Sequence, residues 1–291
     1  MRGIWIISVL AWAQTEKPPQ PSVLENAGKP IRVAFECSDE DIQWAGMSCS
    51  EEEPCPMYLE LSAVEAVGNH LFAIGNIHSS SATLYSMLLS SGDAGSTWRE
   101  PFDRIRGAGL DHMQFLDFQN GWISGEILSP LPRDAFLLIT SDGGQNWRRV
   151  PISEESRGGV IQQFWFDSKQ RGSLVIDRMQ SAESGRYELY DSPNGGDTWM
   201  IRETSDRPLR IKRSGAPNAD LRMRPDASSQ SFVIERRQGE RWNRVASFLV
   251  PIGSCKPQQA REAEPPPEPA APPAPAVIQI KPPSLKRSRP K

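Results

Sequence analysis

The sequence lacks several features that would place it in a familiar class at once. After residue 13 it has no apolar run near the ~18–20 residues that a membrane-spanning helix needs, so we expect the body of the chain to be soluble. It has three His and four Cys without a C-x-x-C pair, which gives no metal-ligand spacing. Gly-x-Ser-x-Gly, His-Glu-x-x-His and phosphate-loop motifs are also missing. We therefore predict no metal site and no cofactor.

Basic residues are missing from one long stretch. No Lys or Arg lies between Arg32 and Arg99, and residues 33–98 hold ten acidic groups, whereas residues 202–244 hold 11 Lys or Arg and 6 acidic groups. One interpretation is that the basic stretch binds an acidic peptide or anionic polymer; the other is that the charge only aids solubility. A pI of about 5.8 without an aromatic and basic platform argues against nucleic acid. The candidate binding residues are Arg207, Arg210, Lys212, Arg213, Arg222 and Arg224.

The N-terminus resembles an export signal. A positive start is followed by the apolar run Ile4–Leu10 and by Ala11-Trp12-Ala13, a small-x-small pattern for signal peptidase. We predict a signal peptide at residues 1–13 and a periplasmic or extracellular location; an uncleaved anchor or a buried first strand are the alternatives. Residues 14–30 are proline-rich and are predicted to be a linker.

The cysteines suit an oxidising compartment. Four cysteines allow three pairings. We favour Cys49–Cys55 as a local clip and Cys37–Cys255 as a bond between the two ends of the domain.

The C-terminal segment differs in composition from the rest. Residues 256–291 contain 11 of the 26 prolines, with seven basic and three acidic residues. Such a segment cannot build a core, so we predict a disordered, partly polyproline-II tail. It would either touch an anionic surface or have no specific partner.

The central part of the chain is repetitive. Three segments read Asp/Asn-x-Gly-x-x-Trp, beginning at Asp93, Asp142 and Asn194, and an eroded copy begins at Arg237. We interpret them as structural hairpin turns, with each Trp wedged into a neighbouring sheet, rather than as catalytic acids. The residues assigned to this structural role are Ser91, Asp93, Gly95, Trp98, Ser141, Asp142, Gly144, Trp147, Ser192, Asn194, Gly196, Trp199, Gly239 and Trp242.

The spacing of these turns predicts the fold. Strand-like runs flank each turn, and a second turn lies 21 to 24 residues upstream, so each period offers about four short strands, which is one propeller blade. The prediction is an all-β propeller over residues 31–255, with repeats at about 58–103, 104–152, 153–203 and 204–250. Residues 31–57, with strand candidates at Ile31–Phe35 and Ile42–Ala45, would form a minimal fifth blade or complete the last one.

The turn pattern is similar to the Asp-box, or BNR repeat. Phe115-x-Asp117-x-x-x-Gly121-Trp122, followed by Thr140-x-Asp142-Gly143-Gly144-x-x-Trp147, resembles the photosystem II stability/assembly factor family. That resemblance implies a chaperone-like propeller that holds partner proteins. We therefore expect a non-catalytic, monomeric scaffold that binds an envelope protein or peptide, whether or not the source is photosynthetic. A sialidase-like glycoside hydrolase is the alternative, because sialidases also carry Asp-boxes.

Overall fold

A computed structural model describes part of the chain, namely residues 23–128, 134–153, 158–179, 185–213 and 220–257. The predicted signal peptide, most of the predicted linker and the tail from residue 258 lie outside the described residues. Within them, no helix is long and apolar enough to cross a membrane.

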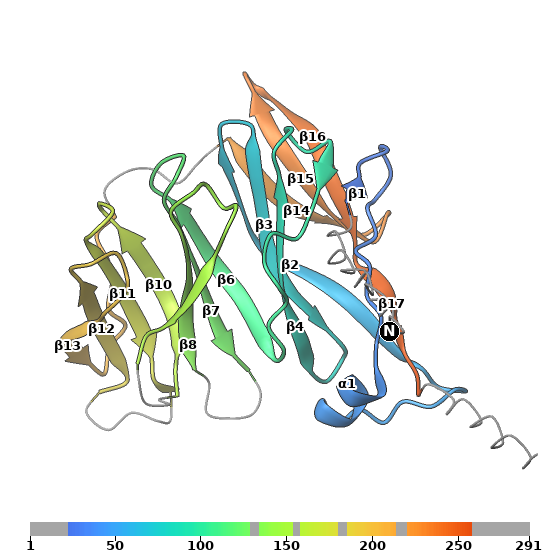
Figure 1. Cartoon of the computed structure of the whole chain (residues 1–291), viewed down its shortest axis with the longest axis horizontal. Coiled ribbons are helices and arrows are strands. Elements are labelled where there is room, and N and C mark those ends of the chain that lie inside the picture. Colours follow the sequence, from blue (N-terminus) through green and yellow to red (C-terminus); the bar gives the residue numbers. More distant parts are fainter. Residues whose placement is uncertain (1–22, 129–133, 154–157, 180–184, 214–219, 258–291) are drawn as a thin grey trace, which may run out of the picture. The chain divides into compact units, whose positions relative to one another are not determined.

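The described residues form antiparallel sheets that follow the repeats along the chain (Figure 1). The first sheet has the strand order β17-β2-β3-β4, with β2 (Cys55–Val67), β3 (His70–His78), β4 (Thr83–Ser91) and β17 (Pro251–Cys255). The second contains β6 (Ala108–Phe115), β7 (Gly121–Ile127), β8 (Ala135–Thr140) and β9 (Arg148–Pro151). The third contains β10 (Val160–Phe166), β11 (Gly172–Asp177), β12 (Tyr187–Ser192) and β13 (Met200–Ser205). The fourth contains β14 (Leu221–Asp226), β15 (Ser231–Gln238) and β16 (Arg241–Leu249).

These sheets are the blades of an all-β propeller fold. Their inner strands, which contact one another from blade to blade, are β2, β6, β10 and β14. Each sheet continues from its inner strand in chain order, and β17 is added beside β2 in the first sheet. Hydrophobic clusters join the fourth sheet to the first, the first to the second, and the second to the third. Within the described ranges, no cluster joins the third sheet to the fourth. The far side of the third sheet is instead covered by Leu209 and Ile211, which pack on Val175, Tyr187 and Leu189.

The first and last repeats are therefore neighbours, whereas a closed circle of apolar contacts is not seen in the described residues. Two of the ten acidic groups of residues 33–98, Glu60 and Glu65, lie on β2 of the first sheet, and six of the 11 basic residues of 202–244 lie on the strands of the fourth sheet. Because β14 lies against β2, these two oppositely charged parts of the chain are adjacent.

The N-terminal segment adds to two of the blades. Ile31 forms a parallel bridge to Phe248 on β16, which supports completion of the last blade rather than a fifth blade. β1 (Leu24–Glu25) pairs with β5 (Thr97–Trp98) at the outer edge of the first blade. The linker prediction is thus wrong for β1, because Asn26 also bonds the backbone of the first and fourth sheets and holds this segment in place.

One predicted strand is a helix. Ile42–Ala45 was expected to be extended, but α1 spans Asp39–Trp44. Ser38 caps this helix, because its hydroxyl accepts from the Asp41 N–H and the Asp41 carboxylate accepts from the Ser38 N–H. This reciprocal capping box outweighs the short apolar run that suggested a strand.

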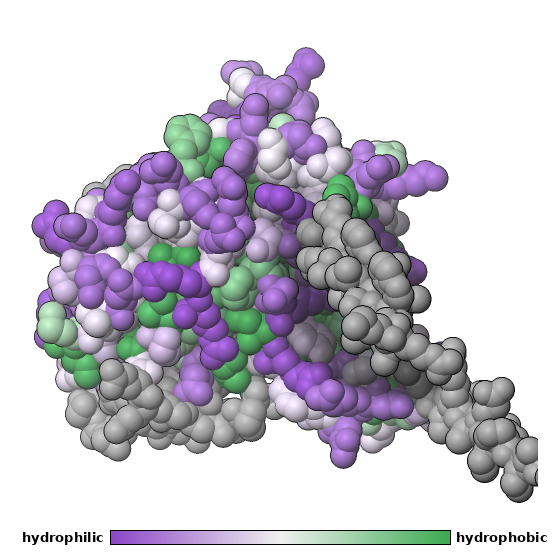
Figure 2. All heavy atoms as spheres, viewed as in Figure 1, coloured by the Kyte–Doolittle hydropathy of each residue, from purple (hydrophilic) through white to green (hydrophobic). Residues whose placement is uncertain are grey.

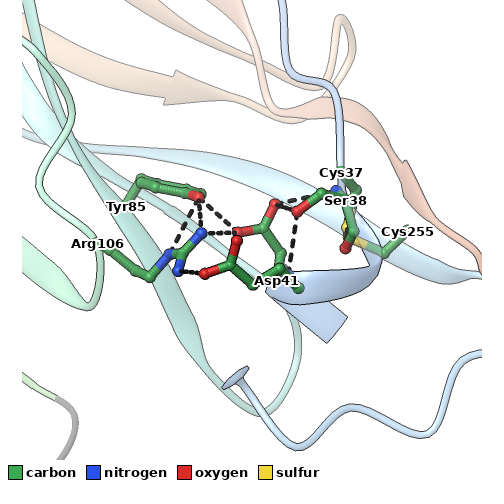
Figure 3. Close-up of polar contacts among 7 residues, drawn as sticks. Cys37, Ser38, Asp41, Tyr85, Arg106 and Cys255 are labelled. Atoms are coloured by element: carbon green, nitrogen blue, oxygen red, sulfur yellow. Dashed lines mark hydrogen bonds and ion pairs between the residues drawn. A yellow bond between two sulfur atoms is a disulfide. The ribbon is translucent and has the colours of Figure 1, made fainter. Parts of the chain in front are cut away.

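Both predicted disulfides are confirmed. Cys37 bonds Cys255 across 218 residues, and Cys49 bonds Cys55 across six. Beside the first of these, the buried Asp41 carboxylate accepts hydrogen bonds from Tyr85 and Arg106 (Figure 3). The Cys37–Cys255 disulfide and the hydrogen bonds of Asp41 together hold the N-terminal segment against the first sheet and against the chain that leads into the second sheet.

Candidate functional site

The three Asp/Asn-x-Gly-x-x-Trp turns share one hydrogen-bond pattern. In the first, the Ser91 hydroxyl donates to Asp93 Oδ1 at 2.8 Å and accepts from the Gly95 N–H at 2.8 Å. Asp93 also accepts from the backbone and side chain of Thr97. These bonds, led by the one from the Thr97 backbone, lower the pKa of Asp93 to about 2. A carboxylate held ionised in this way serves as an acceptor and is unsuited to act as a general acid.

The second turn corrects one assignment. Ser141 was placed in the structural role, but it is exposed, and the hydroxyl that bonds Asp142 and the Gly144 N–H belongs to Thr140. Thr140 is the last residue of β8 and is buried, so it matches Ser91 and Ser192. In the third turn, Asn194 keeps the pattern because its amide oxygen accepts from the Thr198 N–H at 3.0 Å.

The eroded fourth copy does not have this geometry. Gly239 and Glu240 connect β15 directly to β16, and Trp242 lies within β16 opposite Arg237. Its ring lies under the guanidinium of Arg222, 4.1 Å from the ring centroid. The structural turn role given to Gly239 and Trp242 is therefore wrong, because the hydroxyl and the carboxylate or amide that build the other turns are missing.

Each of the other three Trp residues donates its indole N–H to the carbonyl of its turn glycine: Gly95, Gly144 and Gly196. Trp98 meets Phe248 of the fourth sheet edge-on, with ring centroids 5.1 Å apart. Trp147 meets Phe72 of the first sheet at 6.4 Å. The rings of Trp98 and Trp147 thus reach the preceding blade, and Trp199 packs against the cluster shared by the second and third sheets. In the described residues no hydrophobic cluster joins the third sheet to the fourth, and Trp242 contacts Arg222 of its own blade instead.

A cavity of about 380 Å³ lies where the inner strands of three blades meet. We call it the inner groove. Its lining comes from β2, β6, β10 and the segment after β13, and comprises Ala63, Glu65, Ala66, Val67, His112, Met113, Gln114, Phe115, Leu116, Asp117, Phe164, Trp165 and Arg213. In the view of Figure 2, hydrophilic residues cover most of the surface while hydrophobic ones gather over the middle of the molecule.

Side chains fix the strands that form the inner groove. The Gln114 amide donates to the Phe166 carbonyl at 2.9 Å and accepts from the Phe166 N–H at 2.8 Å, which ties β6 to β10. The Ser62 hydroxyl, facing the carbonyls of Ile74 and Leu110, ties β2 to β6. Because Gln114 is buried and uses both ends of its amide, we assign it a positioning role.

Two charged side chains of the inner groove, Asp117 and Arg213, differ in their surroundings. Burial would raise the pKa of Asp117, but hydrogen bonds from Asn120 and Gln119 outweigh it, so the pKa is lowered. The Asp117 carboxylate therefore serves as a hydrogen-bond acceptor within the β6–β7 turn. Arg213 is exposed, and its guanidinium lies 5.9 Å from the centroid of the Trp165 ring, a distance at which a cation attracts an aromatic face.

The structure separates the six predicted basic residues into two groups. Arg207, Arg210, Lys212 and Arg213 follow β13, and of these Arg213 lines the inner groove. Arg222 and Arg224 lie on β14, where both bond the buried Glu235.

The sequence alone did not reveal Trp165, Gln114 and His112, because residues about 50 apart in the chain build the groove and no local motif marks them. Among the described residues, no group of His, Cys, Asp or Glu could hold a metal.

Comparison with known proteins gives a distant likeness of fold. No family model and no curated protein matches the chain. Similar solved structures include YCF48 bound to a D1 peptide (15% identity, TM-score 0.38, covering 67% of this chain and 56% of that one). They also include the phage phi92 endosialidase (11%, TM-score 0.36, covering 65% and 42%). A third is a variant of the alpha-L-arabinofuranosidase arb93a from Fusarium graminearum in complex with an iminosugar inhibitor (12%, TM-score 0.32, covering 68% and 62%). The chain thus spans less than two thirds of each of these structures, and we base no functional argument on them.

Proposed function

We propose that this chain is an exported, non-catalytic scaffold that binds an extended segment of a partner protein in the inner groove. The observation that carries the proposal is the lining of that groove. Phe115 and Trp165, both half-buried, provide aromatic surface beside the buried Phe164, and Arg213 offers an exposed guanidinium above Trp165. A segment with a carboxylate next to apolar side chains fits this combination.

The alternative, a sialidase-like hydrolase, has less support. Glycoside hydrolysis needs a carboxylic acid with a raised pKa beside a second carboxylate. Asp117 in the groove and the turn carboxyls Asp93 and Asp142 instead have lowered pKa values, which do not suit a general acid. We therefore favour binding over catalysis.

The proposal also includes export of the protein and its kinship with a known family. The small-x-small pattern after the apolar N-terminus and the two disulfides support an exported protein. The spacing from Phe115 to Trp147 supports kinship with the photosystem II stability/assembly factor family. We infer no photosynthetic role from that kinship.

A peptide array tests the proposal directly. The purified chain is incubated with immobilised extended peptides in which Asp or Glu stands beside Phe, Leu or Tyr, and affinities of the best binders are measured by calorimetry. We expect Arg213→Glu to weaken binding by tenfold or more, about 1.4 kcal/mol. Arg207→Glu is the matched control, because it changes the same charge in the same segment outside the groove lining. Equal losses in both variants, or no binder in the array, would contradict the proposal, and hydrolysis of a sialoside by the purified chain would establish the enzyme instead.

A further inference from the structure

The four cysteines lie together at one end of the β2–β17 ladder. The Cα atoms of Cys37 and Cys255 are 5.2 Å apart, and those of Cys49 and Cys55 are 5.3 Å apart. β17 is antiparallel to β2, and the register places Cys255 directly opposite Cys55. One member of each disulfide therefore faces a member of the other across the sheet.

This register makes a third pairing geometrically feasible. Residues directly opposite in an antiparallel pair have Cα atoms about 4.5–5.5 Å apart, with their side chains on the same face of the sheet. A disulfide needs Cα atoms about 4.4–6.8 Å apart. The ladder is regular over its last three pairs, from Gly253 opposite Met57 to Cys255 opposite Cys55. Cys55 and Cys255 can thus be bridged while this end of the ladder stays paired.

The two existing disulfides differ in exposure. In one bond Cys255 is completely buried and Cys37 half-buried, whereas in the other both Cys49 and Cys55 are half-buried. The loop between Cys49 and Cys55 contains Glu51, Glu52 and Glu53, all exposed. Both sulfur-bearing residues of the local clip are thus partly accessible to an external thiol, whereas Cys255 is not.

We propose that the cysteine quartet is a thiol–disulfide exchange site whose co-substrate is an external thiol. The external thiolate attacks Cys49 Sγ, forms a mixed disulfide there and releases Cys55 as a thiolate. Cys55 Sγ then attacks Cys255 Sγ, the Cys55–Cys255 bond forms, and the Cys37–Cys255 bond breaks. The electron pair leaves with Cys37 as a thiolate, so the second step involves no net oxidation or reduction.

The exchange changes what the covalent bond holds. Before it, Cys37 ties the N-terminal segment to β17 (Figure 3). After it, the bond staples β17 to β2, and the N-terminal segment is held by non-covalent contacts such as the bridge from Ile31 to β16 and the Asp41 network with Tyr85 and Arg106.

The variant Cys49→Ser tests the second step without added thiol, because it leaves Cys55 as a free thiol opposite Cys255. The protein is held at pH 7 and pH 8, quenched with acid, alkylated and mapped without reduction. We expect a Cys55–Cys255 peptide and alkylated Cys37 to accumulate, about tenfold faster at pH 8 than at pH 7 because the thiolate attacks. Persistence of Cys37–Cys255 with alkylated Cys55 alone would overturn the proposal.

Cys55→Ser is the matched control. It frees Cys49, which lies in the loop before β2 and outside the ladder, so Cys37–Cys255 should persist. Equally fast exchange in this variant would refute the argument from register. As a measurement that needs no substitution, the unmodified chain is treated with a limiting amount of glutathione. The same Cys55–Cys255 peptide should then appear, and its absence while Cys49 is glutathionylated would overturn the proposal.

Discussion

Trp98 and Trp242 occupy the same position of the sequence repeat, yet the structure predicts that they contribute very differently to stability. Trp98 is 1% exposed and packs between two blades against Phe248. Trp242 is half-buried and lies under the guanidinium of Arg222. We therefore expect the free energy of unfolding to fall much further in Trp98→Ala than in Trp242→Ala.

The size of the effect follows from buried area. A Trp buries about 150–250 Å², which at about 25 cal/mol per Å² gives roughly 4–6 kcal/mol. Residual burial in the unfolded chain reduces this to about 3–5 kcal/mol, as found for large aromatic residues in cores. At Trp242 the flexible arginine stem can refill the space and water can enter, so about 1–2 kcal/mol is expected. Trp147→Ala should resemble Trp98→Ala, because Trp147 also lies between two blades.

The assay is guanidinium unfolding followed by far-ultraviolet circular dichroism, which does not depend on the removed indole. Thermal midpoints provide a second readout, with about 2–4 °C expected per kcal/mol for a domain of this size. Equal losses in Trp98→Ala and Trp242→Ala would refute the blade order derived above. So would a loss below about 1 kcal/mol in Trp98→Ala, since a ring between two packed sheets must leave a cavity.

Two further predictions concern hydrogen bonds. Thr140→Val should destabilise the fold by about 1–3 kcal/mol, because it leaves the buried Gly144 N–H unpaired. The neighbouring Ser141→Ala should change the free energy of unfolding by no more than about 0.5 kcal/mol. Chemical unfolding of both variants checks this, and the reverse ranking would return the turn role to Ser141. Burial would raise the pKa of Asp41, but hydrogen bonds from Tyr85 and Ser38 and the charge of Arg106 lower it below 3.8 overall. A lowered pKa contributes stability above the unfolded value that is lost as pH falls through the folded value. Asp41→Asn should therefore be less stable than the unmodified chain at pH 7, by about 2 kcal/mol, and this difference should shrink between pH 4 and pH 2 in an unfolding series; a difference independent of pH would contradict an ionised Asp41.

Local patterns were sufficient to predict the blades. Asp93, Asp142 and Asn194 stand in short turns whose Gly and Trp recur at fixed spacing, so the strands on either side could be predicted without knowledge of distant contacts. The error at Ser141 arose because two hydroxyl residues are adjacent there, and only burial distinguishes Thr140. The helix at Asp39–Trp44 was missed although Ser38 and Asp41 form a capping box, since the apolar Ile42 and Trp44 also fit a short strand.

The inner groove could not be predicted in the same way. Its lining comes from three strands about 50 residues apart, and Gln114 and Trp165 carry no local signal of their position. Arg213 was identified only as one member of a basic stretch, and charge alone did not separate it from Arg222. The lack of an apolar cluster between the third and fourth sheets in the described residues was equally hidden, because it depends on which sheet faces pack and not on the repeat itself.

The inner groove is proposed to bind a peptide segment of a partner. Hydrogen–deuterium exchange of the chain with and without the best peptide from the array tests it most directly. We predict that protection on binding is confined to residues 63–67, 112–117 and 164–165 and to the segment that ends at Arg213, which together line the groove. Protection located instead on β14 around Arg222 and Arg224, with the groove unchanged, would contradict it.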